Sequence, residues 1–422
     1  MVRRPAGVAA LAWRALAALL SLGHAVAGVA GAQSTRARDV PRTVATIPFV
    51  LDDARLYVPV HVPLGGQGSA VRWFIFDTGA QPTVLDAALA DSMGVHVTPS
   101  GTTTGAGGGT TRVGDGGLLT LDVSGIPLGP VSVRIAPLDS LLGATSGRDI
   151  PGIIGSRFFR EHVVELNFDS LAVRVSDPRT FHPPRDAVVV PLDVDGGIPY
   201  ARGWLTTPDG RRVPLHMLVD LGAKSTLLLT EPFIRAQRLE GAFPSHVESP
   251  LGAGMGGPTR YAFVRAPFLD IATSSSPLRA KEALVGLSVG GTLRSTGYDG
   301  LLGADFLSRF HVTFVYARQR MYLVPRVPVP ANTELDMSGL YLMSDRAARQ
   351  LVVQEVRPNS PAQSAGVRPG DALVTLDGRS TAELSLAVVR RLLRSEDGRV
   401  VRLVIARDGA TREVALTLRR DV

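Results

Sequence analysis

The fold is decided by a short stretch that occurs twice in the chain. The first copy, residues 74–85, reads FIFDTGAQPTVL, and the second, residues 217–228, reads MLVDLGAKSTLL. In each copy an apolar run is followed by an Asp, a Gly two residues later, and a second apolar run. The pattern predicts a buried strand, a tight turn that carries the Asp, and another strand. Glycine is the residue that permits such a sharp turn.

A second stretch follows each copy at nearly the same offset. Residues 151–159 read PGIIGSRFF and residues 299–307 read DGLLGADFL, 148 positions apart, while Asp77 and Asp220 are 143 positions apart. Two unrelated elements that recur at nearly one offset indicate an internal repeat. The sequence therefore predicts two lobes of the same, mainly β architecture, over residues 43–180 and 185–326.

Each predicted lobe contains further elements in the same order. Short helices are expected at 87–93 and 231–238, and single alternating strands at 163–175 and 311–324. Gly- and Thr-rich stretches at 100–117 and 252–259 are suited to hairpins or covering loops. Proline-rich breaks at 178–184 and 325–332 are interpreted as linkers.

The doubled Asp-x-Gly-Ala pattern, with its later Ile-Ile-Gly or Leu-Leu-Gly, resembles the retropepsin-like and pepsin-like aspartic peptidases. It is most similar to a bacterial aspartyl protease family that carries a PDZ domain. The resemblance implies that Asp77 and Asp220 form a catalytic pair, with Gly79 and Gly222 donating N–H bonds to the carboxylates. Gly155 and Gly303 resemble the glycines that let a strand pass close beneath each Asp loop. No metal and no cofactor is implied.

The chemistry explains why two carboxylates are needed. Peptide hydrolysis without a metal or a nucleophilic side chain requires an activated water and a protonated carbonyl oxygen. Two carboxyl groups that face each other can share one proton, because like charges at that distance cannot both ionise. One group then acts as a base and the other as an acid.

The second copy departs from the family pattern at Leu221. Thr78 resembles the family residue whose hydroxyl ties the two active-site loops together, and Leu221 has no hydroxyl for the reciprocal bond. Either an apolar contact replaces that bond, or the second loop is looser and the pair imperfect. The covering loops also lack an obvious tyrosine, and Tyr261 is the nearby candidate in the second copy.

Three simpler interpretations compete with this one. A single Asp-x-Gly is most often a turn whose Asp forms local hydrogen bonds. Residues 286–290 read GLSVG, which matches the Gly-x-Ser-x-Gly pattern of serine hydrolases, but no helix pattern follows as that elbow requires. The eight histidines are scattered, so no metal site is predicted.

The C-terminal region, residues 335–420, has a sequence pattern different from that of the two lobes. Residues 360–371 read SPAQSAGVRPGD, and this run resembles a PDZ domain of the bacterial protease type. A helix is expected at 384–393. PDZ domains bind extended peptides by strand addition, and the resemblance places a carboxylate-binding loop at Gly339, Leu340 and Tyr341. Two roles stay open: binding a peptide or protein C-terminus, or packing on the peptidase to regulate its cleft.

The N-terminus and the composition limit the remaining functions. Residues 1–32 have the basic, apolar and small-residue regions of a signal peptide, so we expect an exported, periplasmic or secreted protein, soluble after cleavage. A retained anchor is the alternative. The absence of cysteine excludes disulfides and thiol chemistry. The formal charge of +7 comes from dispersed arginines, which does not favour nucleic acid as a partner.

These observations predict an exported aspartic endopeptidase that acts on polypeptides through Asp77 and Asp220. The first alternative is a catalytically weak or inactive envelope protein that binds peptides in the cleft and the PDZ groove. A structural envelope protein that uses the PDZ domain for assembly is the second.

Overall fold

The structure of the chain is a computed structural model that describes residues 45–65, 68–330 and 333–422. The predicted signal peptide, residues 1–32, lies outside the described residues. Among the described residues, no helix is both long enough and apolar enough to span a lipid bilayer.

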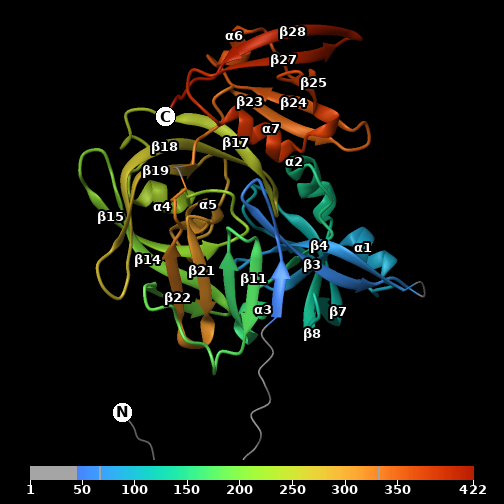
Figure 1. The fold of residues 1–422 in the computed structure, drawn as a ribbon, viewed down its shortest axis with the longest axis vertical. Helices are drawn as coiled ribbons and strands as arrows, with labels where there is room; N and C mark the ends of the chain where they lie inside the picture. The colour runs from blue at the N-terminus through green and yellow to red at the C-terminus, as the bar shows by residue number, and fades with distance from the viewer. Residues whose placement is uncertain (1–44, 66–67, 331–332) are drawn as a thin grey trace, which may run out of the picture. The chain divides into compact units, whose positions relative to one another are not determined.

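Two eight-stranded sheets form the two lobes (Figure 1). The first sheet contains, in spatial order, β2 (Val50–Asp52), β3 (Arg55–Pro63), β4 (Ser69–Phe76), β9 (Gly152–Ile154), β5 (Thr83–Asp86), β8 (Ile126–Ala136), β7 (Thr111–Val123) and β6 (Thr98–Thr103). The second contains β13 (Asp193–Asp195), β14 (Ile198–Thr206), β15 (Arg212–Asp220), β20 (Gly300–Gly303), β16 (Leu227–Leu229), β19 (Leu278–Ser288), β18 (Gly257–Ile271) and β17 (Val247–Gly254). Each strand of one sheet has its counterpart at the same place in the other, so the sequence repeat is a repeat of topology.

A six-stranded sheet joins the lobes. Its strands, in spatial order, are β1 (Ala45–Pro48), β11 (Ala172–Ser176), β10 (Val163–Asn167), β21 (Phe310–Val315), β22 (Arg320–Pro325) and β12 (Val188–Pro191). The lobes meet where β10 pairs antiparallel with β21. Beside this seam, Phe159 of the first lobe contacts Phe314 of the second, with ring centroids 5.6 Å apart. The two lobes therefore share one hydrophobic core.

The predicted single strands at 163–175 and 311–324 are hairpins. β10 and β11 pair antiparallel, as do β21 and β22. Leu171 and Gln319 take left-handed backbone conformations, with φ of 51° and 50°. Neither turn contains Gly or Pro, the usual markers of a turn, which is why the sequence did not reveal them.

Short helices lie between the strands of the lobes. They are α1 (Ala87–Ser92), η1 (Asp139–Gly143), α2 (Ala144–Ser146), α3 (Arg157–Glu161), α4 (Glu231–Ala236), α5 (Ala304–Leu307) and η2 (Tyr316–Arg318). Polar side chains begin the two helices that the sequence predicted: Asp86 accepts a bond from Ala88 N–H, and Thr230 accepts one from Phe233 N–H.

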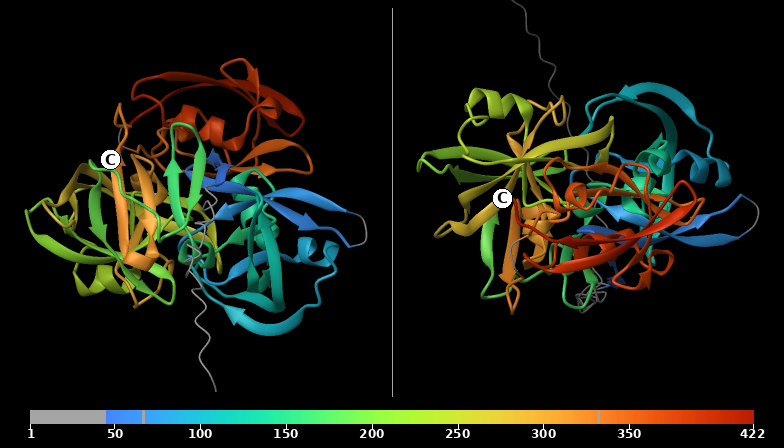
Figure 2. Two further views of the ribbon diagram at one scale, coloured as in Figure 1. Left: turned by 60° about the horizontal axis from the view of Figure 1, so that its bottom comes forward. Right: turned by 90° about the horizontal axis from the view of Figure 1, so that it is seen from above.

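The C-terminal strands form a separate sheet, drawn in orange to red in both views of Figure 2. In spatial order it contains β23 (Leu340–Asp345), β24 (Gln350–Val356), β25 (Ala372–Leu376), β27 (Val400–Arg407) and β28 (Ala410–Thr417), with β26 (Arg379–Ser380) paired to β25. The helices here are α6 (Pro361–Ser364), η3 (Thr381–Glu383) and α7 (Leu386–Leu393). This region has its own hydrophobic core. The mainly β fold is confirmed, and the exact bounds of the lobes stay predictions.

Candidate active site

Each repeated Asp lies where a central strand of its sheet ends. Asp77 follows β4 and donates its N–H to Ile154 O, 3.0 Å away, and Asp220 is the last residue of β15. The neighbouring strand passes beneath each loop at Gly155 or Gly303. A Cβ on Gly155 would lie 2.7 Å from Ala80 O, and one on Gly303 would lie 2.3 Å from Ser225 O. Only glycine lets these strands run so close to the loops.

The structure brings the two predicted aspartates together. Gly79 N–H donates to Asp77 Oδ1 at 2.7 Å, and Gly222 N–H donates to Asp220 Oδ1 at 2.8 Å. The carboxyl groups of Asp77 and Asp220 are hydrogen-bonded to each other. A Cβ on Gly222 would lie 2.4 Å from Asp77 Oδ2, and one on Gly79 would lie 3.0 Å from Asp220 Cγ. Each glycine therefore leaves room for the carboxyl group of the opposite lobe.

The surroundings favour one shared proton on this pair. Burial raises the pKa of Asp77 above its ordinary value, while bonds from Asp220 and Gly79 and the charge of Arg55 limit the rise. Burial, together with the negative charge of Asp77, raises the pKa of Asp220 well above its ordinary value. The proton therefore stays with the pair, mainly at Asp220, at a pH where exposed carboxylates are ionised.

Thr78 connects the two loops through both functions of its hydroxyl. Its Oγ1 donates to Val219 O at 2.6 Å and accepts from Leu221 N–H at 3.0 Å. Thr78 and Leu221 are fully buried, and the Leu221 side chain belongs to the shared core. At Leu221 the structure therefore has packing in place of the reciprocal hydroxyl bond.

A cavity of about 500 Å³ lies over the aspartates. Both lobes line it, and so do the two Gly-rich segments predicted as covering loops. These segments contact each other: Gly107 N–H donates to Met255 O and Gly109 N–H donates to Gly256 O, both at 2.9 Å. An extended chain in the cavity would therefore lie between the aspartates and the covering segments.

Tyr261, the predicted candidate on the second covering loop, lines this cavity from β18. Its side chain is buried, and burial raises the pKa of its hydroxyl. Tyr298 also lines the cavity, and burial raises its pKa to about 12. Both phenols therefore stay protonated at acidic and neutral pH.

The serine-hydrolase interpretation has no support in the geometry. Ser288 is the last residue of β19, is buried, and donates its hydroxyl to Leu229 O at 2.5 Å. The residues that follow form turns and no helix before β20. Ser288 therefore has neither the exposed position nor the elbow that a nucleophile requires.

Sequence reasoning missed the charged groups beside the dyad. The Arg55 side chain is 8% exposed and lines the cavity, as does Lys224. Lys224 Nζ pairs with Asp53 Oδ2 at 3.0 Å, and burial lowers the pKa of Lys224 to about 7. A signal existed for Lys224, because the repeat aligns it with the uncharged Gln81. No repeated motif marked Arg55 or Asp53.

The predicted peptide groove of the C-terminal region contacts the lobes. β23 is an edge strand, and α7 packs beside it. Arg390 of α7 is buried and donates to Leu342 O of β23 and to Thr145 O of the first lobe, both at 2.9 Å. It also donates to Asp53 Oδ2 at 2.7 Å. The edge of β23 to which a peptide would add as a strand is therefore already in contact with residues of the same chain.

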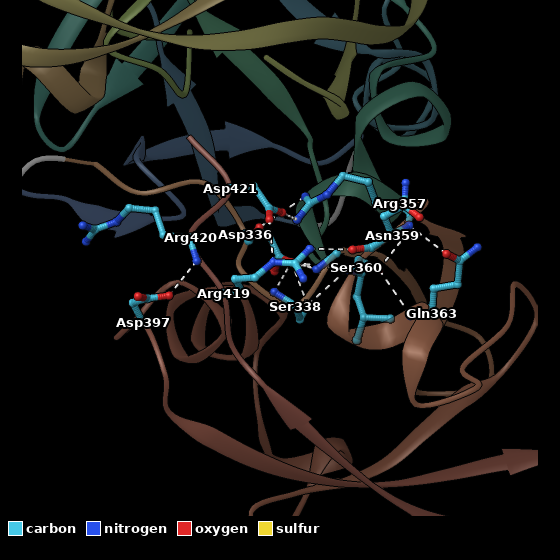
Figure 3. A network of polar contacts seen from close by, with 12 residues as sticks. Asp336, Ser338, Arg357, Asn359, Ser360, Gln363, Asp397, Arg419, Arg420 and Asp421 are labelled. Carbon is cyan, nitrogen blue, oxygen red and sulfur yellow. Dashed lines mark hydrogen bonds and ion pairs between the residues drawn. The ribbon is translucent and has the colours of Figure 1, made fainter. Parts of the chain in front are cut away.

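The predicted carboxylate-binding loop also bonds to its own chain. Asp336 Oδ1 accepts from Gly339 N–H at 2.7 Å and from Leu340 N–H at 3.3 Å. Tyr341 pairs with Glu355 in the sheet. Figure 3 shows Asp336 and Ser338 in one network of polar contacts with Arg357 and Asp421. An internal carboxylate thus occupies two donors that the resemblance assigned to a peptide terminus.

Comparison with protein families finds two domains. Residues 58–158 match the aspartyl protease family and residues 352–407 match the PDZ domain family. The chain therefore contains an aspartyl protease domain and a C-terminal PDZ domain, as the sequence analysis predicted. The first match includes Asp77, and the second includes most of β24 together with β25 and α7.

Similar individual proteins match short parts of the chain. The magnetosome formation protease MamE of Paramagnetospirillum magneticum is 41% identical over 68 residues, which cover 16% of this chain and 9% of that protein. A probable CtpA-like serine protease of Staphylococcus haemolyticus is 28% identical over 81 residues, covering 19% and 16%. The chain thus spans less than a fifth of these relatives. An aspartic proteinase structure from Irpex lacteus aligns over 69% of this chain at 12% identity, with a TM-score of 0.40.

Proposed function

We propose that this protein is an exported aspartic endopeptidase. The observation that carries the proposal is the hydrogen-bonded pair Asp77–Asp220, which joins two lobes of equal topology at the floor of one cavity. Export rests on the sequence of residues 1–32. The relatives include a protein described as a serine protease, but the position of Ser288 supports no serine mechanism here.

The environment of each aspartate suggests its role. Asp77, whose pKa rises less, is the base that takes a proton from water, and the water oxygen attacks the peptide carbonyl carbon. Asp220 holds its proton more tightly and gives it to the carbonyl oxygen. Proton transfer to the amide nitrogen then breaks the C–N bond and releases an acid and an amine. Thr78 and the two glycines keep the carboxyl groups in register.

Hydrolysis of unfolded casein between pH 3 and pH 8 tests the proposal. Asp77→Asn and Asp220→Asn should each reduce the rate by at least about a thousandfold, because acid and base act as one unit. Asp305→Asn is the matched control: Asp305 is a half-buried carboxyl whose pKa is raised to about 6, and it does not line the cavity. Hydrolysis of casein at the wild-type rate by both dyad variants would overturn the aspartic mechanism.

The binding-protein alternative rests on Leu221, and the structure weakens its premise. Thr78 forms both of its bonds to the second loop, and Leu221 is packed in the core. Binding of casein by the wild type with no hydrolysis at any pH would favour this alternative. No described contact favours the assembly role.

We infer that the PDZ domain acts as a docked support of the peptidase and binds peptides only after undocking. Arg390 bridges β23, the first lobe and Asp53, while Asp336 occupies the carboxylate loop. A competing peptide must displace these contacts, which lowers its apparent affinity.

Peptides with free C-termini test this role. Arg390→Gln should bind labelled peptides at least about tenfold more tightly than the wild type, because the docked state loses its contacts. Arg391→Gln, an exposed neighbour on the same helix, is the control. If the wild type binds the peptides tightly and Arg390→Gln binds them with the same affinity, the docking proposal is contradicted.

A further inference from the structure

The charged side chains that line the cavity around the dyad all have the same sign. Apart from Asp77 and Asp220, every charged side chain among the described lining residues is basic: Arg55, Arg134 and Lys224. The dyad itself carries at most one negative charge when it shares a proton. A substrate in this cavity therefore meets a positive potential beside the reacting atoms.

One of the three basic groups has an ionic partner, and a second is only half-buried. Lys224 pairs with Asp53, and both side chains are more than nine-tenths buried. Arg134 is half-buried and donates to Ser100 Oγ at 2.7 Å on the first covering segment. Neither residue therefore presents an uncompensated buried charge to the cavity.

Arg55 is different. It is the first residue of β3 and follows Asp53 and Ala54, whose left-handed backbones (φ of 49° and 61°) turn the chain into the strand. Its Nη1 donates to Ser146 Oγ at 3.0 Å, and its buried Nε has no hydrogen-bond partner. Among the described residues, no carboxylate lies within ion-pair distance of this guanidinium.

A buried guanidinium with an unused donor is costly unless something compensates it. Its fork of donors fits the two oxygens of a carboxylate. Its charge also reaches the dyad, because Arg55 lowers the pKa of Asp77 against the effect of burial. A carboxylate that enters the cavity with the substrate would supply the partner that Arg55 lacks.

We propose that Arg55 forms a carboxylate-binding subsite beside the dyad, so that the preferred substrates are peptides with an acidic group close to the scissile bond. This proposal rests on the proposed peptidase function. The acidic group is either an Asp or Glu side chain within the peptide or the free carboxylate at its C-terminus. Both present the same two oxygens to the guanidinium.

Matched peptides measure the preference and separate the two sources. One series places Asp or Asn, and Glu or Gln, at each position around a single scissile bond; the other ends in a free acid or an amide. At pH 5.5 the peptide carboxylates are largely ionised, since their ordinary pKa is about 4. In one of the two series, we expect the wild type to cleave the acidic peptide with a kcat/KM at least about tenfold higher than that of the matched neutral peptide.

Arg55→Met should reduce the ratio of kcat/KM between acidic and neutral peptides to less than about twofold, and Arg55→Lys should retain part of it. The ratio is the measure, because loss of the Arg55 charge also raises the pKa of Asp77 and changes the rate on both peptide series. Arg112→Gln, an exposed arginine outside the cavity lining, is the control for surface charge. Equal cleavage of acidic and neutral peptides by the wild type would overturn the proposal, even if Arg55→Met did not fold. So would a preference that survives in Arg55→Met. Either result leaves the peptidase function standing if neutral cleavage is lost in Asp77→Asn.

Discussion

The two active-site loops take the same place in their sheets and have different means of support. In the first loop, the Thr78 hydroxyl binds both Val219 O and Leu221 N–H across the lobe boundary. In the second loop, Leu221 is packed in the core and forms no such bond through its side chain. One hydroxyl thus serves both loops, because it has a donor and acceptor sites to offer. The tie between the lobes does not require symmetry; it requires that each buried backbone group has a partner.

Removing the Thr78 hydroxyl should have the largest effect on the free energy of unfolding. Thr78→Val keeps the shape of the side chain and leaves Val219 O and Leu221 N–H buried without this partner. Each such group costs about 1–3 kcal/mol, so we expect a loss of about 3 kcal/mol in the free energy of unfolding by urea. Hydrolysis should fall as well, because the loops lose their register.

Thr83→Val is the matched control in the same lobe. The Thr83 hydroxyl is buried and accepts one long bond, 3.3 Å, from Gly155 N–H. A loss at Thr78 no larger than the loss at Thr83 would show that the cross-lobe bonds contribute little.

The two glycines allow a comparison of the loops at the carboxyl groups themselves. A Cβ at position 222 would lie 2.4 Å from Asp77 Oδ2, whereas one at position 79 would lie 3.0 Å from the Asp220 carboxyl. Gly222→Ala should therefore displace Asp77 and reduce kcat by about a hundredfold, since misplacement of a reacting group by about 1 Å costs that much. Gly79→Ala should cost less than about tenfold. Equal losses would mean that the carboxyl groups adjust freely.

Leu221→Thr asks whether packing has replaced the second hydroxyl bond. The change removes apolar contact from the core and buries a new hydroxyl, so we expect a loss of about 2 kcal/mol in unfolding free energy and lower activity. Leu227→Thr is the control, because Leu227 is equally buried on β16 and outside the loop. It should lose similar stability and keep its rate per folded molecule. A gain in both stability and rate at Leu221→Thr would identify the second loop as a degraded half-site.

The sequence predicted most of this arrangement because the repeat contains it. The paired stretches located both aspartates, both glycine turns and the strands that pass beneath them at Gly155 and Gly303. The support of the second loop was left open, since a pattern of residue types does not show whether Leu221 packs or leaves a gap.

The charged surroundings of the dyad could not be predicted. Asp53, Lys224 and Arg390 are far apart in the sequence and meet only through the packing of three different regions. The occupied loop of the PDZ domain was missed for a similar reason, because the pattern at Gly339 and Leu340 does not show that Asp336 turns back onto their N–H groups.

The pH dependence of stability should distinguish the two aspartates by a smaller effect. A carboxyl whose pKa is raised on folding binds its proton more tightly in the native state. Its contribution to stability is therefore complete below the ordinary pKa near 3.8 and is lost as the pH rises through the raised value. Asp220 has the larger rise, because burial and the charge of Asp77 act in the same direction. The free energy of unfolding should fall as the pH rises above about 4, by at most ~1.4 kcal/mol per pH unit for one proton.

Urea unfolding of the wild type and of Asp220→Asn at half-unit steps from pH 4 to pH 8 isolates this contribution. Asp305 also loses stability as the pH rises from about 4 to 6, since burial raises its pKa to about 6, but it is common to both proteins and cancels in the difference. Lys224 acts in the opposite direction above pH 7, where its lowered pKa lets the folded protein release a proton that the unfolded chain still binds, and it cancels too. Asn at position 220 cannot titrate, and Asp77 then has no ionisable carboxyl group beside it. The difference between the two curves should therefore fall steadily with pH. Parallel curves would mean that replacing Asp220 leaves the proton uptake of the pair unchanged, and the shared proton would then be assigned to Asp77.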